Sequence, residues 1–313
     1  MTLLVREPGP MTTVQDLGRS GYLRYGIPGS GPVDRVAFIL ANRLVGNPDG
    51  AAALECTLIG PKLEVAHECV VAVTGAEMPV TLNGGDAPRW TAMRVKGGDV
   101  LRLGVSRSGL RAYLAVAGGI DVPLVLGSRS TYPRGRLGGY RGRPLQPGDL
   151  LRIGAAPAPL PRLAGRTVRP EAIPRYGAEV EVRVILGPQD DRFTLDGIAA
   201  FLRGPYEMTS ESDRMGARLK GPAITHARGH DIISDGIPLG GVQVVGSGQP
   251  IVLLVDRQST GGYTKIATVC SFDVAKVGQM LPGRRLRFVR VSVAEAHATH
   301  QRECAVLDAA VLD

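Results

Sequence analysis

The amino-acid sequence predicts a mostly β protein of two lobes with a few short helices. Of its 313 residues, 42 are glycine and 23 are proline, which favours many short elements over a few long helices. Three segments, VKGGDVLRLG, LQPGDLLRIG and MLPGRRLRFV, repeat a glycine-containing turn followed by an alternating strand. We expect these repeats to be barrel-closing hairpins in two related halves. A proline-rich stretch in mid-chain separates the halves.

The first part of the chain opens with an extended segment, Leu3–Val14, and continues into a polar, glycine-rich loop. The spacing predicts the first helix at Val33–Val45, where apolar residues recur on one face. Pro32 suits the first helical turn, Asp34 complements the positive N-terminal end, and Gly46 is a stop signal.

Later segments define the remaining elements and the predicted boundaries. Strand candidates KLEVA, CVVAVTG, PVTLN, DVLRLGV and RAYLAVAG complete an N-terminal lobe of residues 1–155. Residues 156–178 hold five prolines and are predicted to be a linker, because proline disfavours both helix and central strand. A C-terminal lobe of residues 179–291 starts with the strand EVRVILG and includes a short helix at DGIAAFL. The last segment, residues 292–313, has the spacing of a terminal helix.

Composition and charge narrow the possible partners. The net charge is +8, but the basic residues are scattered and lack the aromatic-interleaved stripe of a nucleic-acid binder. We therefore expect no nucleic acid and favour a small anionic substrate or an acidic partner protein. The longest strongly apolar run is Ile251–Val255, too short to cross a membrane, and the first ten residues do not resemble a signal peptide. A cytoplasmic protein is predicted.

Cysteine and histidine spacing argues against a metal site. None of the four cysteines lies in a CxxC pair, so buried reduced thiols are expected. His226 and His230 are four residues apart, but THARGHD is a glycine-containing loop and no HExxH motif occurs. We predict no metal. No GxSxG elbow and no GxxxxGK[ST] loop occurs in the sequence either.

The stretch 234–269 carries the strongest functional signal. Short apolar runs alternate there with glycine turns, and polar groups this dense between apolar strands indicate a lined cavity. The polar residues of the stretch are Asp235, Gln243, Gln249, Asp256, Gln258 and Tyr263.

Two loops of the N-terminal half contain further candidates. TVQDLGR places Gln15, Asp16 and Arg19 beside a glycine, as either a capped turn or a functional loop. The segment GSRST is followed by a glycine-rich run in which arginine forks could bind a carboxylate or phosphate. An exposed basic loop is the equally weighted alternative. The arginines concerned are Arg129, Arg134, Arg136, Arg141 and Arg143.

An Asp-Arg pair occurs in the segment SDRMG. Asp213 and Arg214 could orient a substrate, but the residues alone favour an internal ion pair between strands. The same Asp-Arg dipeptide occurs at Asp34 and Arg35, which indicates a weak similarity between the two segments.

The ordered motifs resemble one family over nearly the whole chain. They are TVQDLGRSGY, DRVAFILANRLVGN, ALECTLIGPKLE, AVAGGI with LGSRST, GPQDDRF, SESDRMGARLKG and the stretch 234–269. The family is allophanate hydrolase subunit 2, also called the biotin-dependent carboxyltransferase family or the family of the 5-oxoprolinase C subunit. This sequence departs from it at Thr264 and at Val245-Gly246, where the family often has proline.

The resemblance implies two cyclophilin-like β-barrel lobes and a function within a complex. The first expectation is the C subunit of an ATP-dependent 5-oxoprolinase, which opens 5-oxo-L-proline to L-glutamate. Its partners would be a subunit 1-type or B-type (KipI-like) protein and a lactam-utilisation protein of the A type, with ATP used in the complex. One alternative is a carboxyltransferase that moves a carboxyl group from carboxybiotin to a urea-like acceptor. The other is a KipA-like regulatory protein that binds a kinase-inhibitor partner.

Side-chain chemistry and motif membership assign the candidate roles. Catalytic candidates, which could orient water, move a proton or polarise a carbonyl, are Asp16, Asp213, Asp256 and Tyr263. Substrate-binding candidates are Gln15, Arg19, Arg129, Ser130, Arg214 and Gln243. The candidates for the cofactor are Arg141 and Arg143.

Overall fold

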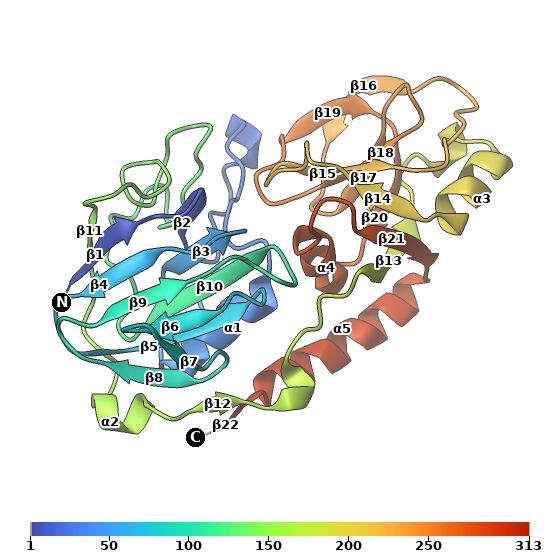
Figure 1. Cartoon of the computed structure of the whole chain (residues 1–313). Coiled ribbons are helices and arrows are strands. Elements are labelled where there is room, and N and C mark those ends of the chain that lie inside the picture. Colours follow the sequence, from blue (N-terminus) through green and yellow to red (C-terminus); the bar gives the residue numbers. More distant parts are fainter. Residues whose placement is uncertain (1, 313) are drawn as a thin grey trace. The chain divides into compact units, whose positions relative to one another are not determined.

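The computed structural model describes residues 2–312 and divides into two compact units (Figure 1). The first unit contains the chain up to Ser20, then Ser30–Arg175, and the residues from Val306 onward. The second unit contains Gly21–Gly29 and Tyr176–Ala305. Strands occupy 35% of the chain and helices 18%, which confirms the mostly β prediction with few short helices.

The first unit is built from two antiparallel sheets. One has the order β11 (Leu150–Arg152), β1 (Thr2–Glu7), β4 (Lys62–Val65), β9 (Val100–Leu103), β6 (Val80–Leu82) and β7 (Gly85–Ala87). The other has the order β2 (Met11–Gln15), β3 (Ala53–Thr57), β10 (Arg111–Val116), β5 (Cys69–Gly75) and β8 (Ala92–Val95). Side chains of both sheets share one hydrophobic core.

A helix explains why β5 is buried along its whole length. Alternate residues Cys69, Val71 and Val73 enter the core shared by the two sheets, whereas Val70 and Ala72 pack in the cluster formed with α1 (Arg35–Leu44). Both faces of the strand are therefore covered. Asp34 is the N-cap of α1, where its carboxylate accepts a hydrogen bond from Ala37 N–H at 3.0 Å. The helix prediction is confirmed to within two residues at each end.

The second unit contains a closed seven-stranded barrel. Its order is β13 (Glu179–Leu186), β20 (Lys265–Val269), β17 (Gly241–Val244), β18 (Pro250–Leu253), β15 (Gly216–Lys220), β14 (Tyr206–Met208) and β21 (Arg285–Arg290). β21 closes the barrel by pairing in parallel with β13. A separate two-stranded sheet joins β16 (Asp231–Gly236) and β19 (Thr260–Tyr263). The helices of this unit are α3 (Leu195–Arg203), α4 (Val274–Gly278) and most of α5 (Val293–Asp308).

The three repeated segments form equivalent turns. In the first two, an aspartate accepts a 2.7 Å hydrogen bond from the N–H three residues earlier, from Lys96 to Asp99 and from Gln146 to Asp149. The third copy has Arg284 at this position. Each turn leads into a strand that pairs with β4, β1 or β14, and not with the preceding strand. The repeats are therefore strand-entry turns, and their prediction as hairpins is wrong.

The proline-rich stretch packs largely on the first unit. It contains α2 (Leu160–Leu163) and β12 (Thr167–Val168), which pairs with β22 (Val311–Leu312). Leu163 and Val168 are buried in the cluster around α1. The described residues contain no helix long and apolar enough to span a membrane.

Candidate functional site

Polar side chains from three strands of the second unit converge near Gly261 of β19. The strand register pairs Asp235 with Gly261 and places Gln243 opposite Lys265. A Cβ atom at Gly261 would lie 2.8 Å from Gln243 Nε2, so only glycine lets the carboxamide lie this close to the strand. We call Asp235, Gln243, Gly261 and Lys265 the amide-facing cluster.

Lys265 is fully buried and has its ammonium group directed to a carboxylate. Its Nζ lies 3.2 Å from Asp235 Oδ2, and 55% of the Asp235 side chain is exposed. Hydrogen bonds from Lys265 and from the Gly236 N–H hold the pKa of Asp235 below its usual range. The cluster therefore presents an ammonium group and an ionised carboxylate side by side.

Gln243 adds a polar group with unused hydrogen-bonding capacity. Only 5% of the residue is exposed, and its Nε2 has no hydrogen-bond partner among the described residues. A buried donor without a partner costs about 1–3 kcal/mol, so such a group indicates a missing acceptor. A substrate carbonyl oxygen is an acceptor of the right kind.

Tyr263, the last residue of β19, lies beside His230, which in turn lies beside His226. Its ring stacks against His230 with centroids 6.1 Å apart, and 41% of the tyrosine is exposed. Burial, followed by the charge of His230, lowers the pKa of His226, whose Nε2 lies 3.1 Å from Thr264 Oγ1. The described residues contain no cluster of three potential metal ligands.

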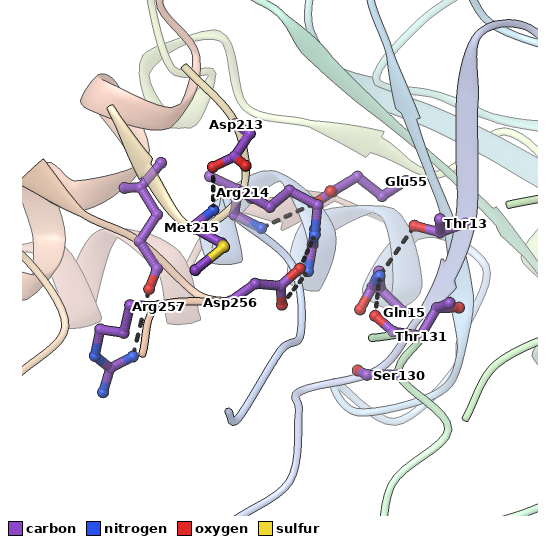
Figure 2. A network of polar contacts seen from close by, with 12 residues as sticks. Thr13, Gln15, Glu55, Ser130, Thr131, Asp213, Arg214, Met215, Asp256 and Arg257 are labelled. Carbon is purple, nitrogen blue, oxygen red and sulfur yellow. Dashed lines mark hydrogen bonds and ion pairs between the residues drawn. The ribbon is translucent and has the colours of Figure 1, made fainter. Parts of the chain in front are cut away.

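Arg214 and Asp256 form a buried ion pair (Figure 2). Arg214 Nε lies 2.8 Å from Asp256 Oδ2, and both side chains are at most 7% exposed. Asp213 instead caps the local turn, because its Oδ1 accepts hydrogen bonds from the N–H groups of Met215 and Gly216. Arg214 therefore forms an internal ion pair, as the sequence favoured, but its partner is Asp256 and not the neighbouring Asp213.

In the first unit, Asp16 anchors the GSRST loop. Its Oδ1 accepts hydrogen bonds from the hydroxyl groups of Ser128 and Ser130, both at 2.6 Å, and from the Gly18 N–H. Its Oδ2 accepts one from the Arg129 N–H. Four donors already occupy the oxygens of this carboxylate, so the geometry favours an anchoring role over the catalytic one considered from the sequence.

The other candidates of the TVQDLGR loop reinforce this anchor. Gln15 Nε2 donates to Thr13 Oγ1 and to the Thr131 carbonyl (Figure 2). Arg19 is buried and donates from its guanidinium to the Ser130 carbonyl. The contacts with Ser130 and Thr131 span more than 110 residues of sequence, so these side chains fix the loop to β2 and the segment that follows it.

The arginines of the glycine-rich run differ in their contacts. Arg129 Nε donates to the Val122 carbonyl at 2.8 Å, and Arg143 binds both oxygens of Asp149 at 2.8 Å. The exposed Arg141 lies over the Tyr140 ring, and its guanidinium forms no ion pair or hydrogen bond with the described residues. Arg141 and Arg143 therefore do not act as one fork.

The predicted candidates thus separate into one group in each unit. Within the second unit, Gln243 lies in the barrel and Tyr263 in the two-stranded sheet, while Arg214 pairs with Asp256. The residue that the sequence analysis missed is Lys265. Its signal is a lysine at the start of the mostly apolar strand KIATV, where complete burial of a charge requires a partner.

Comparison with known proteins identifies the family. The family described as "Carboxyltransferase domain, subdomain A and B" matches residues 25–290. The chain belongs to this carboxyltransferase domain family. The resemblance drawn from its sequence motifs is therefore confirmed.

Individual members of the carboxyltransferase domain family match over very different shares of their length. The C subunit of 5-oxoprolinase from Escherichia coli is 38% identical, over 96% of this chain and 94% of that protein. The urea amidolyase of Lachancea kluyveri is 36% identical over 97% of this chain, which spans only 18% of that protein. The crystal structure of the K. lactis urea amidolyase superposes with a TM-score of 0.92 at 36% identity, over 98% of this chain and 20% of that one.

Proposed function

We propose that this protein is the C subunit of an ATP-dependent 5-oxoprolinase, which cleaves 5-oxo-L-proline to L-glutamate together with subunits of types A and B. The observation that carries the proposal is the match to 94% of the length of a 5-oxoprolinase C subunit. The matched urea amidolyase is a far longer protein, of which the chain spans less than a fifth. Because the E. coli relative is named as one subunit of an enzyme, a requirement for further subunits is also supported.

The amide-facing cluster suits a lactam. A lactam presents one carbonyl acceptor and one N–H donor, and both need a partner when the group is bound away from water. Gln243 Nε2 lacks an acceptor among the described residues, and the Asp235 carboxylate can accept from an N–H group. We assign the carbonyl oxygen to Gln243 and Lys265 and the ring N–H to Asp235.

The chemistry assigned to these residues is stabilisation of charge on the amide oxygen. ATP would supply the phosphoryl group that activates this oxygen, with ADP leaving. Attack of water on the carbonyl carbon would then break the C–N bond, with a proton passing to the ring nitrogen, and a second water would release inorganic phosphate and leave the carboxylate. Lys265 offers an ammonium group in a buried position, where it stabilises negative charge more strongly than in water. No Walker-type loop occurs in the sequence, so no residue of this chain is assigned to the nucleotide.

The carboxyltransferase alternative has one supporting observation. Urea is also an amide, and the urea amidolyase relatives match the chain about as well as the oxoprolinase subunits do in identity. The same cluster could therefore hold a urea-like acceptor of a carboxyl group from carboxybiotin. The cluster alone does not choose between the two substrates, because both use the same donors and acceptor.

Reconstitution separates these functions. The chain should be co-purified with its A-type and B-type partners and assayed for ATP hydrolysis that depends on 5-oxoproline, with glutamate as the product. Parallel reactions should contain urea, bicarbonate and a biotin-carboxylating system. Activity with 5-oxoproline supports the proposal, whereas carboxylation of urea supports the alternative. A stable complex with neither activity would overturn both and favour the regulatory partner-binding role.

A further inference from the structure

The first unit contains a cavity that has no part in the function proposed above. Its volume is about 710 Å³, and it is lined by residues 121–123 and Val125, by the glycine-rich segment 138–142, and by the ends of β1 and β11. None of its lining residues belongs to the second unit or to the amide-facing cluster. The volume lies in the range of ordinary small-molecule sites.

Two arginines whose guanidinium groups are not directly paired with a carboxylate line this cavity. Arg141 and Arg152 are both exposed, and neither guanidinium forms a hydrogen bond or ion pair with the described residues. This contrasts with Arg143, which follows that segment directly and whose guanidinium is bound by Asp149. Asp121 is the acidic side chain of the lining, so the cavity carries a net positive charge.

The segment that presents Arg141 is held in a fixed and unusual conformation. Arg141 has a φ of 56° and Gly142 one of 69°, so two successive residues are left-handed, which is costly for a non-glycine residue. A Cβ atom on Gly142 would lie 2.2 Å from the Arg136 carbonyl oxygen, and the Gly142 N–H donates to the Gly138 carbonyl at 2.8 Å. The close packing positions Arg141 before any ligand binds.

Part of the cavity wall is apolar, which indicates that the ligand has an apolar part besides its charged group. Pro123 and Leu150 contribute exposed apolar surface, and Leu150 is 55% exposed although it is a large aliphatic residue. A bare inorganic ion would leave this surface in contact with water. An organic body attached to the anion would cover it.

We propose that this cavity binds an organic oxyanion, a molecule with a carboxylate or phosphate group on an apolar body. The guanidinium groups of Arg141 and Arg152 bind the oxyanion, a contact that both carboxylates and phosphates satisfy. The body lies against Pro123 and Leu150, and Asp121 accepts a hydrogen bond from a ligand hydroxyl or amine. The inference does not rest on 5-oxoprolinase activity and concerns the chain alone.

Calorimetric titration of the full-length chain in phosphate-free buffer tests this inference. The probes are inorganic phosphate, AMP as an organic phosphate, and L-glutamate as an organic carboxylate. We expect at least one organic probe to bind with a Kd of 1 mM or lower, at least tenfold tighter than inorganic phosphate. Binding of AMP identifies a phosphate ligand, and binding of glutamate identifies a carboxylate ligand.

Variants locate the binding in the cavity. Arg141→Gln and Arg152→Gln should each weaken the organic probe at least tenfold, and Leu150→Asp should do so by placing a carboxylate on the apolar wall. Arg107→Gln, an exposed arginine of the same unit outside the lining, should change the Kd less than twofold. Thermal melting checks that each variant is folded. The proposal is overturned if no organic probe reaches 1 mM, if inorganic phosphate binds equally well, or if the cavity variants bind like the control.

Discussion

The ammonium group of the buried Lys265 lies 3.2 Å from the half-exposed carboxylate of Asp235. The two residues are 30 positions apart and come from different sheets of the second unit. Because a buried ammonium needs a partner, Asp235 makes the position of Lys265 tolerable. Because Asp235 also faces solvent, the pair can exchange this contact for one with a bound substrate.

Replacement of Lys265 by methionine should separate a role in the reaction from a structural one. Methionine keeps most of the side-chain volume, and the exposed Asp235 can be hydrated, so we expect little change in Tm. In the reconstituted complex, 5-oxoproline-dependent ATP hydrolysis should fall about 100-fold, the order of effect seen when one stabilising donor is removed. Lys96→Met is the matched control at an exposed position. Activity within threefold of wild type would remove Lys265 from the mechanism.

Gln243→Leu should reduce activity without reducing stability. The Nε2 atom has no partner among the described residues, so its loss costs no hydrogen bond and the burial of leucine is favourable. We expect an unchanged or higher Tm together with a drop of roughly 10-fold or more in kcat/KM. A lower Tm with normal kinetics would mean that the carboxamide has only a structural role.

The Arg214–Asp256 pair should make a large contribution to the free energy of unfolding. Removing one partner of a buried pair leaves an uncompensated charge and typically costs about 3–5 kcal/mol, so Arg214→Ala should lower the free energy of unfolding by an amount of this order. Chemical unfolding measures the loss, and Glu211→Ala, which removes an exposed acid of the same unit, is the control. If Arg214→Ala were as stable as this control, the pair would contribute nothing to the fold.

Asp16→Ala should loosen the GSRST loop. The substitution leaves the Arg129 N–H and two serine hydroxyl groups without their acceptor, at a cost of about 2–4 kcal/mol. Amide hydrogen exchange at Arg129 should accelerate in the variant. Exchange unchanged from wild type would show that the loop is held by other contacts.

The stability of the second unit should decrease in mild acid because of His226. Its folded-state pKa is lowered by burial and by His230, so protonation favours the unfolded chain. The stabilisation is complete above the unfolded value, near 6.5, and is lost as the pH falls through that value toward the lowered folded pKa. The groups that contact His226 include Thr264, Phe193, His230 and the Val244 backbone, with Asp231 beside His230.

Melting curves between pH 5 and pH 8 measure this effect. His226→Gln removes the titrating group, so its Tm should vary less with pH over this range than that of wild type. His297→Gln, on the exposed part of α5, is the control and should keep the wild-type slope. Equal slopes in all three proteins would contradict the prediction.

Local patterns allowed the regular elements to be predicted, because each depends on neighbouring residues. The stripe at Val33–Val45 and the cap Asp34 were sufficient for α1, and the alternating runs were sufficient for most strands. The repeated turns were recognised, but not that they join strands which do not pair with each other. Pairing is a property of the whole sheet and leaves no mark on the turn itself.

The site was harder to predict because its contacts are long-range. Asp16 was a plausible catalytic acid until Ser128 and Ser130, more than 110 residues away, were found to bind it. Gln243 could be predicted as a site residue because it is a polar residue between apolar runs. Lys265 could not, because a single lysine in a strand usually faces solvent, whereas this one is buried. Only the structure shows which charged side chains are buried.

The division of the chain into units restricts how this protein can be cut or recombined. The polypeptide passes from one unit to the other after Ser20, Gly29, Arg175 and Ala305. Cleavage after Arg175 would strip the first unit of β22, the strand paired with β12, and the second unit of Gly21–Gly29. Neither half of the gene encodes a complete unit, so chimaeras with relatives require four matched junctions and a single crossover would yield two defective products.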